Sequence, residues 1–282
     1  MLFSLLWSAI LVDPDVSVIV PTHRREKLVV RAVASALSQR DTRLEVLVLD
    51  DTEEGSAREA IASISDPRVV YIKRETPSRG RPALVRNEGI QRANGRFLHF
   101  LDDDDALHDD ALAWLRAPLE AQPGVGTAFG VVDPFGDDAE VLARERSHYS
   151  QAASSARKCN GSRLKFSREI LFGTAPFINS ACLIRRDVAR AIGGYDGSLA
   201  MAEGYEFFLR AIRAHGAVFV DRPVLRHQTG LPSLCQNVEP GVWSATYRAM
   251  YDMYRTRYGI LEFFALRAWA RLARLSSSGL PS

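Results

Sequence analysis

The sequence predicts an α/β fold, in which a mainly parallel sheet carries helices on both faces. Short aliphatic and β-branched runs, typical of buried strands, alternate with segments whose apolar residues recur every three or four positions, typical of helices. This β-α-β-α-β-α-β order favours parallel strands with the helices between them packed on the two faces of the sheet. The expected strands are 16–20, 44–49, 68–73 and 96–101, and the expected helices are 28–39, 58–64 and 83–93.

Polar residues directly follow three of the expected strands. Pro21 and Thr22 end the first strand, Asp50 and Asp51 end the second, and the acidic run 102–105 ends the fourth. In parallel sheets ligands bind beyond the carboxyl ends of the strands. We therefore expect these residues to gather at one rim of the sheet and to form a ligand site there.

The composition is that of an ordinary globular protein, with 46% hydrophobic and 25% charged residues among 282. The formal net charge of +2 gives no argument for nucleic-acid binding. Three widely spaced cysteines indicate neither a disulfide framework nor a zinc module, which favours a reducing compartment, the cytoplasm. We expect one domain over residues 14–228 and a helical extension over 229–282.

Both ends of the chain carry apolar segments. The run 1–12 is too short to span a bilayer, which takes roughly 20 residues, and it lacks the features of a secretory signal. It is expected to pack on the domain or a partner, or to contact a membrane surface. Residues 260–275 alternate apolar residues with arginines, so this helix could pack on the domain, form a homodimer, or lie peripherally on the inner membrane face.

The acidic run predicts a site for a hard divalent cation. Four successive carboxylates repel one another unless a cation compensates them, and carboxylate oxygens suit Mg²⁺ or Mn²⁺. A solvated turn that caps the next helix is the alternative interpretation. The glycine-rich phosphate loops of dehydrogenases and P-loop NTPases are missing from the sequence. Phosphate would therefore be held by metal and side chains, with Arg24, Arg25, Arg79, Arg81 and Arg86 as the nearby cations.

Several segments, in their order and spacing, resemble family 2 glycosyltransferases, which have the Rossmann-like GT-A fold. Residues 16–22 are similar to the opening strand of that family, and 44–51 to its second strand with paired aspartates. Residues 86–105 are similar to the stretch that leads into its metal-binding D-x-D motif. The acceptor-side segment and the helix carrying the general base are matched by 184–187, 193–196 and 203–210.

The resemblance implies a nucleoside-diphosphate sugar donor, with a UDP-sugar preferred, and an acceptor that is a saccharide, a lipid carrier or a small natural product. Mg²⁺ or Mn²⁺ would bind at Asp102 and Asp104, with Asp104 preferred, or at Asp103 or Asp105 instead. His227 is a further candidate metal ligand, with a purely structural role as its alternative. The donor-binding residues implied are Pro21, Thr22, Arg24, Asp51, Arg86 and Asp103.

The resemblance also implies inverting transfer, in which a carboxylate takes the proton of the acceptor. The family usually carries this base as the aspartate of a Glu-Asp pair, but here Gly204 follows Glu203. Glu203 is the expected base. The alternatives are Glu206, a base from elsewhere in the chain, or an acceptor that needs no strong base. The glycine would free space beside the anomeric carbon. A catalytically impaired homologue that only binds sugar nucleotides is the other interpretation. Residues 148–165 are expected to form a mobile loop over the acceptor site.

Overall fold

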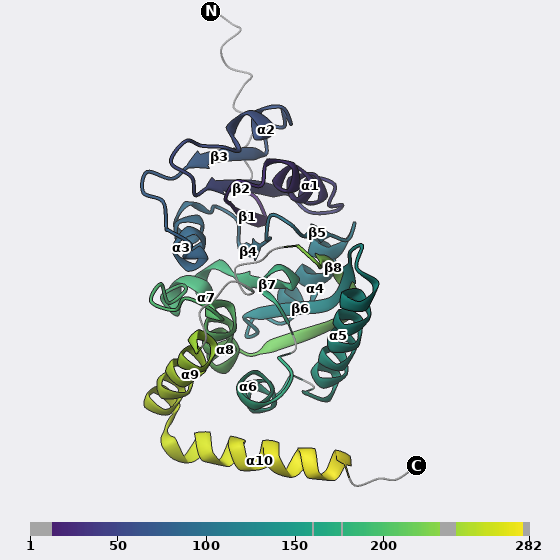
Figure 1. The fold of residues 1–282 in the computed structure, drawn as a ribbon, viewed down its shortest axis with the longest axis vertical. Helices are drawn as coiled ribbons and strands as arrows, with labels where there is room; N and C mark the ends of the chain where they lie inside the picture. Colours follow the sequence, from purple (N-terminus) through teal and green to yellow (C-terminus); the bar gives the residue numbers. More distant parts are fainter. Residues whose placement is uncertain (1–12, 160, 176, 232–240, 279–282) are drawn as a thin grey trace, which may run out of the picture.

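The computed structural model describes residues 13–159, 161–175, 177–231 and 241–278 (Figure 1). The apolar run 1–12 and Cys235 lie outside these residues, so the expectations attached to them stay predictions. Within the described part of the chain, no helix is long and apolar enough to cross a bilayer.

In the described part of the chain, eight strands form one sheet with the order β3-β2-β1-β4-β7-β6-β8-β5. Its strands are β1 (Val16–Thr22), β2 (Leu44–Asp50), β3 (Val69–Lys73), β4 (Phe97–Phe100), β5 (Ala106–Leu107), β6 (Thr127–Phe135), β7 (Cys182–Arg185) and β8 (Ala217–Gln228). The first four strands along the chain pair in parallel, as expected. The sheet is mixed, because β7 is antiparallel to β4 and β6, and β5 is antiparallel to β8.

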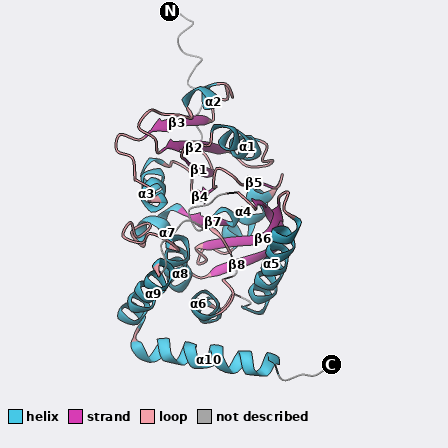
Figure 2. Ribbon diagram, viewed as in Figure 1, coloured by secondary structure: helices cyan, strands magenta, loops and turns pink. Residues whose placement is uncertain are grey.

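Helices cover both faces of the sheet (Figure 2). They are α1 (Glu26–Leu37), α2 (Arg58–Ala62), α3 (Pro82–Arg92), α4 (Ala111–Ala121), α5 (Ala139–Cys159), α6 (Arg163–Phe172), α7 (Arg186–Ala191), α8 (Glu203–His215), α9 (Val242–Tyr258) and α10 (Ile260–Ser278), with a 3-10 turn η1 (Asn179–Ala181). The side chains of β1 alternate between the two faces. Val18 joins the core under α1 and α4, whereas Ile19 joins the core under α3 and α8. The α/β prediction with two helical layers is therefore confirmed.

The C-terminal helical segment that the sequence predicts is present as α9 and α10. Met250 and Tyr254 of α9 and Phe263 and Leu266 of α10 belong to the core under α8. The two helices are joined at Gly259, whose positive φ of 96° suits glycine. This segment is therefore packed against the α/β unit, with α10 lying across one end of the molecule (Figure 1).

The expectation of a mobile loop over 148–165 is wrong. Helix α5 continues to Cys159, and α6 begins at Arg163. Tyr149, Ala152 and Ala156 recur at helical spacing and are buried against the sheet. The serine content of this segment suggested a loop, but its alanines and arginines are strong helix formers, and packing decides the outcome.

Candidate functional site

A cavity of about 580 Å³ opens at the carboxyl ends of β1, β2 and β4. One side is formed by the strand ends and the start of α3, and the other side by η1, the start of α8 and the start of α9. The predicted residues that line it are Pro21, Thr22, Asp51, Arg86, Asp102, Asp103, Asp104 and Glu203. The structure therefore brings most of the expected site together from segments that are far apart in the sequence.

Arg24 does not line the cavity, although it was expected to bind the donor. Its side chain is 67% exposed and pairs with Glu54 at 3.1 Å. The adjacent arginine, Arg25, lines the cavity instead and pairs with two carboxylates of the acidic run. The sequence offered both arginines as nearby cations and did not distinguish which of them faces inward.

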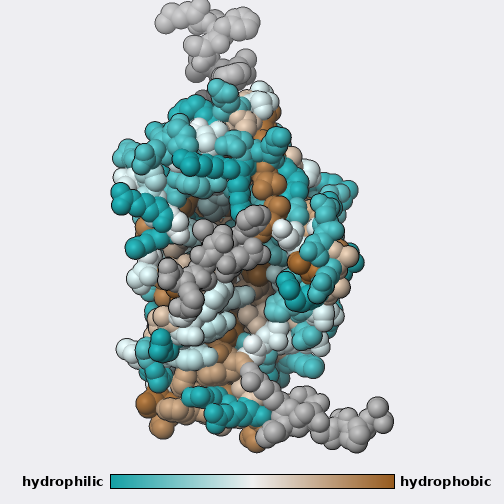
Figure 3. Space-filling model, viewed as in Figure 1, coloured by the Kyte–Doolittle hydropathy of each residue, from teal (hydrophilic) through white to brown (hydrophobic). Residues whose placement is uncertain are grey.

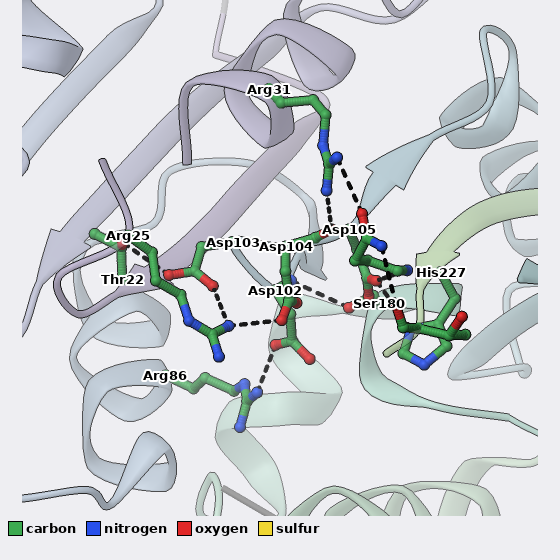
Figure 4. Close-up of polar contacts among 12 residues, drawn as sticks. Thr22, Arg25, Arg31, Arg86, Asp102, Asp103, Asp104, Asp105, Ser180 and His227 are labelled. Atoms are coloured by element: carbon green, nitrogen blue, oxygen red, sulfur yellow. Dashed lines mark hydrogen bonds and ion pairs between the residues drawn. The ribbon is translucent and has the colours of Figure 1, made fainter. Parts of the chain in front are cut away.

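Two arginines compensate the middle of the acidic run (Figure 4). Arg25 donates to Asp103 at 3.1 Å and to Asp104 at 2.6 Å, and the Thr22 hydroxyl donates to Asp103 at 2.8 Å. Arg31 on α1 donates to the backbone carbonyl of Asp104 at 2.5 Å. These contacts hold the acidic run against the end of β1 and the start of α1. The run is therefore an ordered part of the cavity wall and not a solvated turn.

Negative charge is still in excess at the acidic run. Burial, together with the neighbouring carboxylates, raises the pKa of Asp104 to about 6. Burial also raises the pKa of Asp103, although Thr22 and Arg25 oppose this. The second carboxylate oxygen of Asp105 is buried without a hydrogen-bond partner. A cation placed at Asp102 and Asp104 would relieve this repulsion, so these two carboxylates fit a hard divalent ion.

No cluster of three or more aspartate, glutamate, histidine or cysteine side chains is arranged as a ready metal site in the described ranges. The expected ligands at the cavity, Asp102 and Asp104, are two carboxylates, which is how Mg²⁺ and Mn²⁺ bind when a substrate phosphate supplies further oxygens. The fit therefore favours a cation that binds together with a diphosphate over one held by the protein alone.

His227 is adjacent to the acidic run but does not line the cavity. Its Nδ1 lies 2.9 Å from Oδ1 of Asp105. The same Oδ1 accepts a hydrogen bond from the backbone N–H of Gln228 at 3.1 Å. Burial alone would lower the pKa of His227, but the hydrogen bond and charge of Asp105 outweigh it and raise the pKa. A histidine whose Nδ1 bonds a carboxylate is oriented to use Nε2 as a ligand.

Arg86 connects the donor side of the cavity to the opposite side. It is 4% exposed, and its guanidinium donates to Asp102 and to Glu203, each at 2.7 Å. Asp102 follows β4, whereas Glu203 is the first residue of α8. The pairing joins residues 117 positions apart, so no local pattern in the sequence could have indicated it.

Asp51 is held by partners that the sequence did not suggest. Arg74 donates to its Oδ1 at 2.5 Å, the backbone of Ser78 donates to the same oxygen at 2.7 Å, and the Ser78 hydroxyl donates to Oδ2 at 2.5 Å. These contacts leave one accepting position on Oδ2. Asp51 is thus a fixed, 6% exposed acceptor in the cavity wall.

Comparison with known proteins identifies the family. The sequence model of Glycosyl transferase family 2 matches residues 17–193, which is more than half of the chain. The chain belongs to this family. The predicted resemblance is thereby confirmed.

Several curated proteins are similar to this chain over part of its length. The putative colanic acid biosynthesis glycosyl transferase WcaA of Escherichia coli is 28% identical over 72% of this chain and 68% of its own length. The GalNAc(5)-diNAcBac-PP-undecaprenol beta-1,3-glucosyltransferase of Campylobacter jejuni is 34% identical over 42% of this chain and 38% of its own. The succinoglycan biosynthesis protein ExoO of Rhizobium meliloti is 36% identical, and the alignment spans 32% of its length.

Solved structures support the family 2 assignment at the level of the fold. S. aureus TarS residues 1–349, crystallised with UDP-GlcNAc, superposes with a TM-score of 0.68 at 19% sequence identity. The match covers 89% of this chain and 69% of that one. The expected GT-A fold is therefore confirmed.

The chain departs from the usual family 2 pattern at Gly204, and the structure shows what occupies that place. A Cβ on Gly204 would lie 2.5 Å from Oδ1 and 2.7 Å from Nδ2 of Asn179. The expectation that the glycine frees space is wrong, because the Asn179 amide fills it. Asn179 lines the cavity and accepts a 3.4 Å hydrogen bond from the Tyr195 hydroxyl. It was missed because a 3-10 turn leaves no periodic signal in the sequence.

Glu206, the alternative base, does not line the cavity. Its carboxylate forms a two-point ion pair with Arg210, at 2.5 and 2.7 Å, and is 3% exposed. Arg210 also donates to the backbone carbonyls of Ile192 and Gly194. Glu206 therefore orients Arg210, which anchors α8 to the preceding loop, and Glu203 is the carboxylate of this helix that lines the cavity.

Proposed function

We propose that the protein transfers a sugar from a nucleoside-diphosphate sugar to an acceptor hydroxyl, with inversion at the anomeric carbon. The observation that carries this proposal is the Arg86 bridge, which joins Asp102 at the donor end to Glu203 within one cavity. Membership of family 2 supports the reaction class. The chain spans about a third of the length of some relatives, so the activity is proposed and not transferred from them.

We propose a UDP-sugar as the donor. Asp51 offers one free accepting position to an N–H of the base, and Pro21 and Thr22 line the same wall. The UDP-GlcNAc complex of TarS, which has the same fold, supports this choice. Arg25 lies where it can approach the diphosphate, because it reaches the acidic run from the cavity wall.

Asp102 and Asp104 would hold Mg²⁺ or Mn²⁺, and His227 is proposed as a further ligand through Nε2. The cation would neutralise the charge that builds on the leaving diphosphate. Arg86 and Arg25 hold Asp102 and Asp104 in place through their ion pairs. The protein thereby orients two carboxylates at the strand end before the donor arrives.

Glu203 is proposed as the base that takes the proton of the acceptor. Arg86 binds Oε1 of Glu203, which leaves Oε2 available to accept that proton. Asn179, which fills the space over Gly204, is proposed to orient the acceptor hydroxyl or the sugar through its amide. Glu203 therefore replaces the usual aspartate from one position earlier, at the first residue of α8.

We propose a saccharide acceptor, which a lipid carrier can hold. The name of the Campylobacter jejuni relative includes a diphospho-undecaprenol acceptor, and that of the Rhizobium meliloti relative includes succinoglycan biosynthesis. A homologue that only binds the donor is the second candidate. It is favoured by Gly204, which stands where the family usually carries the base aspartate.

The test combines binding with turnover. UDP-, GDP- and dTDP-sugars are offered with Mn²⁺ and a panel of free and lipid-linked saccharides, while release of nucleoside diphosphate is measured. We expect turnover with a UDP-sugar, and a loss of at least about 100-fold in Glu203→Gln with UDP binding retained. Glu54→Gln, at an exposed pair outside the cavity, is the matched control.

Two outcomes contradict the proposal. Thermal stabilisation by UDP without turnover on any acceptor, in both wild type and Glu203→Gln, would favour the binding homologue. An absence of stabilisation by any of the three nucleotides would overturn the donor assignment itself.

A further inference from the structure

Helix α10 is apolar on two opposite sides. Its inner side packs on the core through Phe263 and Leu266, which are 2% and 3% exposed. Its outer side carries Leu261, Phe264 and Leu272, which are 84%, 47% and 65% exposed. A helix that only covered a core would place polar residues outward, so the outer side needs another explanation.

The outer side forms a continuous stripe. Its residues are Leu261, Phe264, Ala265, Ala268 and Leu272, all exposed. Counted from Leu261, the other four lie three, four, seven and eleven positions along the chain. This spacing places all five on one face of a helix over roughly 16 Å. Of the eight large apolar side chains that are exposed in the described ranges, five lie on α10. Figure 3 shows apolar surface gathered at this end of the molecule.

The charge beside the stripe is positive. Arg267 and Arg271 are exposed and one helical turn apart, along one edge of the stripe. The single acidic residue of α10, Glu262, turns inward, where it accepts from Arg213 and from the Tyr254 hydroxyl, each at 2.6 Å. No described side chain of α10 therefore offers a negative charge on its outer side.

We propose that this stripe docks on an anionic lipid surface, with α10 lying in the plane of the interface. An amphipathic helix with an apolar face and basic flanks binds such surfaces through apolar burial and charge attraction. Trp269, 38% exposed, is a residue type enriched at the membrane–water interface.

A second copy of the chain fits the stripe less well. Packing two α10 helices against each other would bring their arginines together with no outward carboxylate on either helix to compensate them. Like charges brought together at an interface are unfavourable. The phosphates of an anionic bilayer supply the missing negative charge.

The test uses the full chain and vesicles of phosphatidylcholine, with and without phosphatidylglycerol, in a flotation assay. We expect wild type to bind the anionic vesicles and to be released by salt in part. Leu261→Ser/Phe264→Ser/Leu272→Ser should weaken binding at least about tenfold, because the apolar area drives insertion. Arg267→Gln/Arg271→Gln should lose the preference for phosphatidylglycerol. Val70→Ser, an exposed apolar residue on β3, is the matched control and should bind as wild type.

The assay needs no donor or turnover, so its result is independent of the proposed reaction. Equal vesicle binding by wild type and the triple serine variant would overturn the proposal, as would no binding of wild type to anionic vesicles. Light scattering supplies the other decisive outcome. A wild-type dimer that the triple variant converts to monomer would make the stripe a homodimer interface instead.

Discussion

Arg86 donates one hydrogen bond to Glu203 and another to Asp102, both at 2.7 Å, so one guanidinium holds the proposed base and a proposed metal ligand. The two carboxylates come from different elements, the start of α8 and the end of β4. Any change at Arg86 therefore acts on both ends of the reaction at once. This relationship gives the site a specific mutational signature.

The first prediction concerns Arg86→Lys. Lysine keeps the positive charge but cannot donate to two carboxylates in the planar geometry of a guanidinium. We expect kcat to fall by at least about tenfold, and the Mn²⁺ concentration for half-maximal activity to rise, because Glu203 and Asp102 are both released. Steady-state kinetics over a Mn²⁺ series measure both effects. A rise in the donor KM alone, with kcat and the Mn²⁺ dependence unchanged, would contradict a role for Arg86 in holding both Glu203 and Asp102.

The second prediction concerns Gly204 and Asn179. Gly204→Ala places a Cβ 2.5 Å from the Asn179 amide, so we expect a loss of about 1–3 kcal/mol in unfolding free energy and reduced turnover. Asn179→Ala/Gly204→Ala should be more stable than the sum of the single changes implies, because the clash is removed. Urea unfolding of the four proteins forms the double-mutant cycle. Additive free energies would show that the two residues do not compete for this space.

The third prediction concerns the pH dependence of metal binding. The pKa of Asp104 is raised to about 6 by burial and by its neighbouring carboxylates, so its carboxyl becomes protonated at a mildly acidic pH. A protonated carboxyl is a poor ligand, so the apparent affinity for Mn²⁺ in the presence of UDP should fall as pH drops through 6. Titration calorimetry at several pH values measures this. Asp104→Asn should bind more weakly than wild type above pH 6, approach the wild-type affinity below it, and lose this inflection.

The fourth prediction concerns His99, which is fully buried on β4. Burial lowers its pKa to about 4, and the backbone of Cys182 and the charge of Asp102 oppose this only in part. The unfolded chain takes up a proton near pH 6.5, whereas the folded chain does so only near 4. Stability is therefore lost as pH falls through this window, by up to about 3 kcal/mol.

Asp104 acts in the opposite direction over part of this range, because its folded pKa is raised. A variant that removes only the histidine isolates the effect. The unfolding free energy of wild type minus that of His99→Gln should decrease by up to about 3 kcal/mol as pH falls from 7.5 to 4, whatever its value at pH 7.5. A difference that is constant over that range would show that His99 does not titrate as the burial implies.

The strands and helices of roughly the first hundred residues were predictable from sequence, because apolar residues recur at strand or helix spacing and polar residues or proline mark the ends of the elements. The β-branched run of β1, ended by Pro21, and the acidic residues after β2 and β4 mark the strand ends, and parallel strands bring those ends to one rim. This reasoning located Asp51, Asp102 and Asp104 in the cavity wall, as found.

The other side of the cavity was less accessible to such reasoning. Asn179 sits in a short turn, and the pairing of Arg86 with Glu203 depends on how α8 packs across the sheet. The direction of β7 was also hidden, because a short apolar strand has the same pattern in either orientation. Tertiary packing decides these features, and local pattern does not report them.

Helix α9 begins at the cavity, which Trp243 lines, and ends at the turn into α10. Seventeen residues make it about 24 Å long. If α10 lies on a bilayer, the N-terminal end of α9, which is at the cavity, can stand no farther above the end of α9 at the lipid surface than the length of α9. A reacting hydroxyl on the first sugar of a lipid diphosphate lies close to that surface, whereas one several sugars along the chain lies farther out. The length of α9 would then act as a spacer that selects acceptors by how far they extend from the membrane.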